Sequence, residues 1–193
     1  MRSSEPWRGR LAVGLAALSL LGGLAACTQP APAASAACIV AGAPLTAPQA
    51  REAAAWQVAI EQGPLYAAVS ASSPRAACEL ARDADGQLTL RYRFGDGNTL
   101  RASRNPAIEY DEQSARFERP PAEDALALLA RAERAAFGDG GCGIAWTPDE
   151  SGALDGEPGV TETVYRGEVC NCQARVRRGA QGQLLGLLLR SAC

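Results

Sequence analysis

Residues 87–94, Gln-Leu-Thr-Leu-Arg-Tyr-Arg-Phe, carry the pattern that decides the fold. Apolar side chains at positions 88, 90, 92 and 94 alternate with polar side chains at 89, 91 and 93. Because successive side chains of a strand point to opposite faces of a sheet, this period of two predicts a half-buried strand with a basic outer face. Asp85-Gly86 before it and Gly95-Asp96-Gly97-Asn98 after it are turn sequences that join antiparallel strands.

The same alternation continues on the C-terminal side of this strand. Three further segments, 100–103, 108–111 and 115–118, have apolar residues at every second position. Together they predict an antiparallel meander of about five short strands. A second hairpin is expected near the C-terminus, with arms at 162–178 and 183–189.

Two helices are predicted, one before each group of strands. The first spans 46–62, with Thr46 as N-cap and Gly63 after its end. The second spans 123–137, with acidic residues in its first turn and Gly138 after its end. This order of elements predicts an α+β fold in which two helices pack on an antiparallel meander sheet.

Composition limits the chemistry that the chain can perform. Its 193 residues suffice for one ordinary globular domain, and all 19 basic residues are Arg, with no Lys and no His. Nucleophilic pairs that need His or Lys, Schiff-base lysines and His-ligated zinc are therefore excluded. The net charge of -2 also argues against a nucleic-acid partner. No cofactor, metal or catalytic residue is predicted.

The N-terminal residues form a leader of the secretory type. Three arginines, Arg2, Arg8 and Arg10, precede an apolar stretch over 11–26. With 16 residues, this stretch is shorter than the ~20 that a bilayer-spanning helix needs, so it is typical of a signal-peptide core.

The leader ends in Leu24-Ala25-Ala26-Cys27, which resembles the lipobox of bacterial lipoproteins. The resemblance implies cleavage before Cys27, a diacylglycerol on its thiol and a third acyl chain on its amine. Such a group would hold the chain stably in the lipid bilayer. Because Thr28 is not the Asp that retains lipoproteins at the inner membrane, the same analogy favours the outer membrane, facing the periplasm.

These patterns divide the chain into three parts. They are a signal peptide at 1–26, a lipidated cysteine with a Pro/Ala-rich tether at 27–45, and a single compact α+β domain at 46–193. Without the leader, 16 arginines and 20 acidic residues remain.

Six cysteines remain besides Cys27, and an even number in an exported domain predicts a disulfide framework. The candidates are Cys38, Cys78, Cys142, Cys170, Cys172 and Cys193. Their pairing is left open by the sequence. If Cys38 is bonded to the domain, the free tether is shorter. A close Cys170–Cys172 couple would suit thiol exchange or a soft metal, whereas the alternative is that each of these two cysteines bonds to a distant partner.

Two further features are candidates for binding a partner. An arginine group on adjoining strands could contact an anionic polymer of the envelope, such as the carboxylates or phosphates of lipopolysaccharide or peptidoglycan; it consists of Arg91, Arg93, Arg101 and Arg104. The alternative is that these arginines pair across strands with Glu109, Asp111 and Glu118. Trp146 is either a recognition aromatic or a residue packed beside the Cys142 disulfide.

The sequence thus favours a non-enzymatic outer-membrane lipoprotein that binds an envelope protein or polymer, or assists envelope assembly. Two alternatives stay open. One is an inhibitor that protects the envelope from a secreted hydrolase, as lysozyme inhibitors do; the other is a thiol-redox or metal-handling lipoprotein that uses Cys170 and Cys172.

We predict that Cys27 is acylated. Cells that express the full chain with radiolabelled palmitate should yield a labelled protein, and Cys27→Ser should abolish the label because the acceptor thiol is gone. Cys38→Ser serves as the control and should keep it. A wild-type chain without label would refute the anchor.

Overall fold

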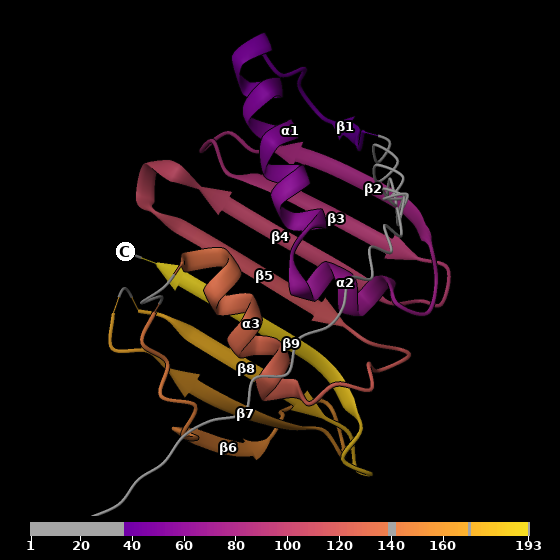
Figure 1. Ribbon diagram of the computed structural model, residues 1–193, viewed down its shortest axis with the longest axis vertical. Coiled ribbons are helices and arrows are strands. Elements are labelled where there is room, and N and C mark those ends of the chain that lie inside the picture. Colours follow the sequence, from indigo (N-terminus) through magenta and orange to yellow (C-terminus); the bar gives the residue numbers. More distant parts are fainter. Residues whose placement is uncertain (1–36, 139–141, 170, 193) are drawn as a thin grey trace, which may run out of the picture. The chain divides into compact units, whose positions relative to one another are not determined.

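The computed structural model describes residues 37–138, 142–169 and 171–192. Within these residues, nine strands form one sheet in the order β1-β2-β3-β4-β5-β9-β8-β7-β6, and the helices cover one of its faces (Figure 1). The helices are α1 (Ala47–Glu61), α2 (Pro64–Ser70) and α3 (Ala125–Phe137), and a short 3-10 turn spans Pro106–Ile108. The strands are β1 (Ile39–Ala41), β2 (Arg75–Arg82), β3 (Leu88–Phe94), β4 (Thr99–Asn105), β5 (Tyr110–Arg116), β6 (Glu150–Ala153), β7 (Thr161–Arg166), β8 (Gln173–Arg178) and β9 (Leu184–Ala192).

The sheet consists of two antiparallel meanders that meet at their last strands. Strands β2 to β5 follow α1 and α2, and strands β6 to β9 follow α3. The meanders are joined by antiparallel pairing of β5 with β9, from Tyr110 opposite Ala192 to Arg116 opposite Gly186. The two halves therefore share one continuous sheet and one core.

The structure, which is mostly sheet, agrees with the α+β class, but the prediction of two helices on an antiparallel meander sheet was imprecise. The sheet is mixed, because β1 pairs parallel with β2. Helices α1 and α2 lie between these strands in the chain, and such a crossover connection is what parallel strands require. The helix that was not predicted, α2, begins at Pro64 after the N-cap Gly63. At seven residues it is too short to show a helical period in the sequence.

Two strand predictions also need correction. The segments at 108–111 and 115–118 were expected to be separate strands, but residues Tyr110–Arg116 form the single strand β5. Ile108 belongs to the preceding 3-10 turn and is 62% exposed. Its alternation with Tyr110 in the sequence therefore did not reflect a buried strand face. Strand β6 lies in a Gly-rich segment whose sequence has no strand pattern, and all four of its residues are exposed.

The helix boundaries have identifiable caps. Asp124 was expected inside the first turn of the second helix; instead it is the N-cap, and its carboxylate accepts hydrogen bonds from the backbone N–H groups of Leu126 (2.9 Å) and Ala127 (3.1 Å). At the start of α1, the Thr46 N–H donates to the Gln49 side chain (2.9 Å). Both arrangements satisfy polar groups that a helix end leaves without partners.

The alternation in 88–94 has the predicted effect on packing from Leu90 onward, whereas Thr89, expected on the outer face, is buried. Leu90, Tyr92 and Phe94 are buried toward the helices, whereas Arg91 and Arg93 are exposed. Tyr66 of α2 packs edge-on against both aromatic rings, with centroids 5.2 Å from Tyr92 and 5.5 Å from Phe94. This cluster fixes the helix-covered face of β3, and the regular pleat then determines which residues face the other way.

The expected disulfide stabilisation is confirmed by two bonds, Cys38–Cys78 and Cys142–Cys172. The first ties β1 to β2, and the Cys38 N–H also donates to Gln57 of α1 (3.4 Å). Strand β1 and Cys38 therefore lie inside the range 27–45 that was expected to be a tether. Among the described residues, no helix is long and apolar enough to cross a membrane.

Asn98, in the turn between β3 and β4, joins three separate segments and is fully buried. Its side-chain NH₂ donates to the carbonyl oxygens of Val69 and Arg119, both at 3.2 Å. Its side-chain oxygen accepts from the N–H groups of Glu118 (2.9 Å) and Arg119 (3.0 Å). All four hydrogen-bonding positions of the amide are thus used, which holds the end of α2 against the chain that leaves β5.

We predict that Asn98→Ala lowers the free energy of unfolding by about 3 kcal/mol, because several buried backbone groups lose their partner together. Urea denaturation of the oxidised protein would measure the loss. Asn105→Ala is the matched control, since the Asn105 side chain makes two such bonds, and it should cost roughly 1 kcal/mol. A loss at Asn98 no larger than at Asn105 would contradict this role.

Candidate functional site

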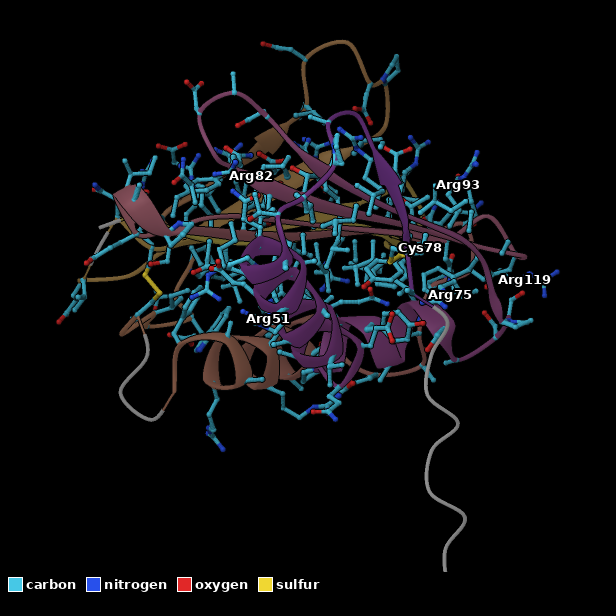
Figure 2. The ribbon with its side chains drawn as sticks, turned by 90° about the horizontal axis from the view of Figure 1, so that it is seen from above. Arg51, Arg75, Cys78, Arg82, Arg93 and Arg119 are labelled. Atoms are coloured by element: carbon cyan, nitrogen blue, oxygen red, sulfur yellow. A yellow bond between two sulfur atoms is a disulfide. The ribbon has the colours of Figure 1, made fainter. Side chains whose placement is uncertain are left out.

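A groove of about 590 Å³ lies on the helix-free face of the first meander. Strands β1 to β4 supply its side chains: Ile39 and Ala41, Ala77 and Glu79, Arg91 and Arg93, Thr99 and Arg101. Figure 2 shows Arg93 on one side of the sheet and Arg51 with the helices on the other. The groove is therefore lined by the side chains of these strands that point away from the core.

Strand register arranges these side chains in two rows. In one row, Arg93 lies between Ala77 of β2 and Thr99 of β4. In the next row, Arg91 lies between Glu79 and Arg101. Directly opposed residues have Cβ atoms roughly 5 Å apart and diagonal neighbours roughly 7–8 Å, so the three long guanidinium side chains can converge on one ligand group.

The groove carries positive charge that its surroundings do not neutralise. Arg91 forms an ion pair with Glu79 at 2.8 Å. Among the described residues, no carboxylate lies within 4.0 Å of the guanidinium of Arg93 or Arg101. Arg101 also stands directly opposite Arg91, a like-charge arrangement that costs stability.

The prediction of one stripe of four arginines was wrong for Arg104. It lies in β4 three residues after Arg101, and a spacing of three puts the two side chains on opposite faces of a strand. Arg104 lies opposite Asp111 in register, with its Nε atom 3.7 Å from an Asp111 carboxylate oxygen. Burial raises the pKa of Asp111, and the attraction of Arg104 only partly offsets that rise.

The alternative, that the arginines pair with acids on the next hairpin, describes Arg104. It does not describe the groove arginines Arg93 and Arg101. Of the three acids expected as partners, Asp111 pairs with Arg104, and Glu118 pairs with Arg116 at 3.6 Å. Glu109 follows the 3-10 turn with a φ of +46°, and no ion pair joins it to a described arginine.

The carboxylate of Glu112, on the strand next to β4, is hydrogen-bonded to a residue outside the groove. Glu112 of β5 accepts a hydrogen bond of 2.8 Å from the Tyr110 hydroxyl. Burial, and then this bond and the charge of Glu112, raise the pKa of Tyr110 to about 12. The hydroxyl therefore stays protonated at neutral pH and keeps donating to Glu112.

The second meander has a different charge balance on the same face. Arg175 and Arg177 share Glu162, with N–O distances of 3.0 and 2.7 Å. Arg177 also lies 3.7 Å from Glu157. Arg175 and Arg177 are thus neutralised within this half, whereas Arg190 of β9 donates a hydrogen bond to Gln173 (3.2 Å).

Trp146 does not belong to the groove. It packs against the hydrophobic core, with its ring centroid 5.8 Å from that of Tyr165 in β7. Its φ of +54° is rare for a bulky residue. Of the two interpretations offered by the sequence, core packing describes its surroundings.

The cysteine pairing bears on the redox alternative. Cys172 is bonded to Cys142, with Cα atoms 5.5 Å apart, so its sulfur is not available for a couple with Cys170. Cys27, Cys170 and Cys193 lie outside the described residues.

One group of three potential metal ligands occurs in the described part of the chain, formed by Cys38, Glu61 and Cys78. The two sulfurs are bonded to each other, and Glu61 pairs with Arg75 at 2.7 Å. These atoms are therefore engaged in structural interactions.

The sequence did not single out the groove residues outside β3 and β4. Ile39, Ala41 and Ala77 are small or apolar residues without a motif, and only strand register brings them beside the arginines. The useful signal was the spacing of two residues between Arg91 and Arg93. Pairing of β3 with β4 then places Arg101 opposite Arg91 on the same face.

Comparisons of the chain with protein-family models, with curated proteins and with solved structures found no match.

We predict that Arg101→Glu raises the free energy of unfolding by roughly 0.2–1 kcal/mol, because it replaces the like-charge pair with an attractive one. Urea denaturation at low and high salt would measure the change. The gain should shrink in high salt, where the pair is screened. A clear loss of stability at low salt would mean that Arg101 has a stabilising partner.

Proposed function

We propose that this chain is a lipid-anchored, periplasm-facing binding protein without catalytic activity of its own, which holds an anionic partner of the outer membrane in the groove. The observation that carries the proposal is the pair of exposed guanidinium groups, Arg93 and Arg101, that have no carboxylate partner among the described residues. Arginine favours phosphates and carboxylates because its planar fork can donate two parallel hydrogen bonds.

The lining of the groove is suited to holding an anion. Its one carboxylate, Glu79, is occupied by Arg91, which lowers its repulsion of a ligand. Thr99 adds a hydroxyl that can donate a hydrogen bond. A volume of about 590 Å³ falls within the usual range for small-ligand sites.

The proposed location rests on the leader and is supported by the disulfides. Bonds such as Cys38–Cys78 and Cys142–Cys172 persist in oxidising compartments, of which the periplasm is one. The twelve Cα-to-Cα steps from Cys27 to Ile39 span at most about 40 Å. An acylated Cys27 would therefore keep the groove close to the membrane surface.

The test is co-sedimentation of the chain with isolated outer-membrane fragments, using Cys27→Ser so that an acyl anchor does not contribute. The groove variant R93E/R101E should bind about tenfold more weakly than the parent, because an anion would face two negative charges instead of two positive ones. Added salt should weaken binding of the parent.

The matched control is R51E/R134E, which changes the net charge equally at exposed positions on α1 and α3. It should bind like the parent. Equal loss in both variants would mean that only overall charge matters, and no loss in either would refute the groove as a binding site.

A further inference from the structure

The groove has an apolar end as well as a basic end. Ile39 of β1 is 77% exposed, the largest exposed fraction among the large hydrophobic residues of the described chain. Ala41 and Ala77 continue this apolar surface beside it. The basic end, with Arg93 and Arg101, lies on β3 and β4 of the same face.

The distance between the two ends fits a ligand with a charged head and an aliphatic body. Ile39 and Arg101 belong to one register row, separated by the positions of Glu79 and Arg91. Three strand spacings of about 4.8 Å give a separation of roughly 14 Å between their backbones. The ion pair of Glu79 with Arg91 lies between the ends and presents no net charge to an aliphatic chain that crosses it.

We propose that the groove binds a single anionic lipid, with its phosphate held by Arg93 and Arg101 and its acyl chain lying over Ile39 and Ala41. The proposal rests on the proposed function, because it names the ligand class of the same groove. A phosphate offers several oxygens, which can accept hydrogen bonds from two guanidinium groups and from the Thr99 hydroxyl together.

A lipid fits the observations better than a charged polymer does. A polysaccharide phosphate or carboxylate would use the arginines but would leave Ile39 in water. Burial of a large aliphatic side chain contributes about 1.5–3 kcal/mol, so an acyl chain over Ile39 adds affinity that a polymer lacks.

The experiment measures binding of soluble probes to the Cys27→Ser chain by isothermal titration calorimetry. Dihexanoyl phosphatidic acid carries both the phosphate and short acyl chains. Inorganic phosphate has the charge alone, and dihexanoyl phosphatidylcholine has the same chains with no net charge. The first probe should bind at least about tenfold more tightly than either of the others.

Two variants separate the contributions of the two ends. R93E/R101E should abolish binding of phosphatidic acid. Ile39→Ser should reduce the affinity for phosphatidic acid to that for inorganic phosphate and leave phosphate binding unchanged. Val58→Ser is the matched control, because Val58 is 52% exposed on α1, and it should change neither affinity. Thermal melts of each variant would confirm that the fold is retained.

The outcomes distinguish the ligand class from the site itself. Equal affinities for phosphate and phosphatidic acid, both lost in R93E/R101E, would overturn the lipid proposal and keep the anion site. Tighter binding of an acidic peptide than of phosphatidic acid would also overturn it, in favour of a protein partner. Binding of any probe that R93E/R101E leaves unchanged would overturn both proposals.

Discussion

The alternation of side chains along β3 governs both faces of the first meander. Leu90, Tyr92 and Phe94 must face the helices to form the core, so Arg91 and Arg93 must face the other way. A shift of one residue would bury two arginines and expose two aromatic rings. The core and the basic groove are therefore two consequences of one pleat, and neither can change register without the other.

The pairing of β5 with β9 turns two small meanders into one sheet. The joint lets both halves bury their apolar faces under the helices in one core. Yet the halves differ in charge. Arg175 and Arg177 are neutralised by Glu162 and Glu157, whereas Arg93 and Arg101 have no such partner in the described chain. This asymmetry, rather than the total number of arginines, is the reason for proposing a binding surface on the first half.

The groove retains an arrangement that disfavours folding. Arg91 and Arg101 stand opposite each other, and the carboxylate that pairs with Arg91, Glu79, lies on its other side, away from Arg101. Proteins commonly retain such locally unfavourable arrangements at functional sites. The exposure of Ile39, at the other end of the same row, is also unfavourable, because it leaves a large apolar side chain in water.

Local features could be predicted from the sequence: the strand at 88–94, helices bounded by Thr46 and Gly138, the arginine-rich outer face, and disulfides. These depend on side-chain period and on residues adjacent in the chain, which a sequence displays directly. The parallel strand β1, the brief helix α2, the place of Arg104 and the partners of the cysteines were decided only by the tertiary structure. Each depends on which distant strands pair and in what register, and that choice follows from packing of the whole core rather than from any local pattern.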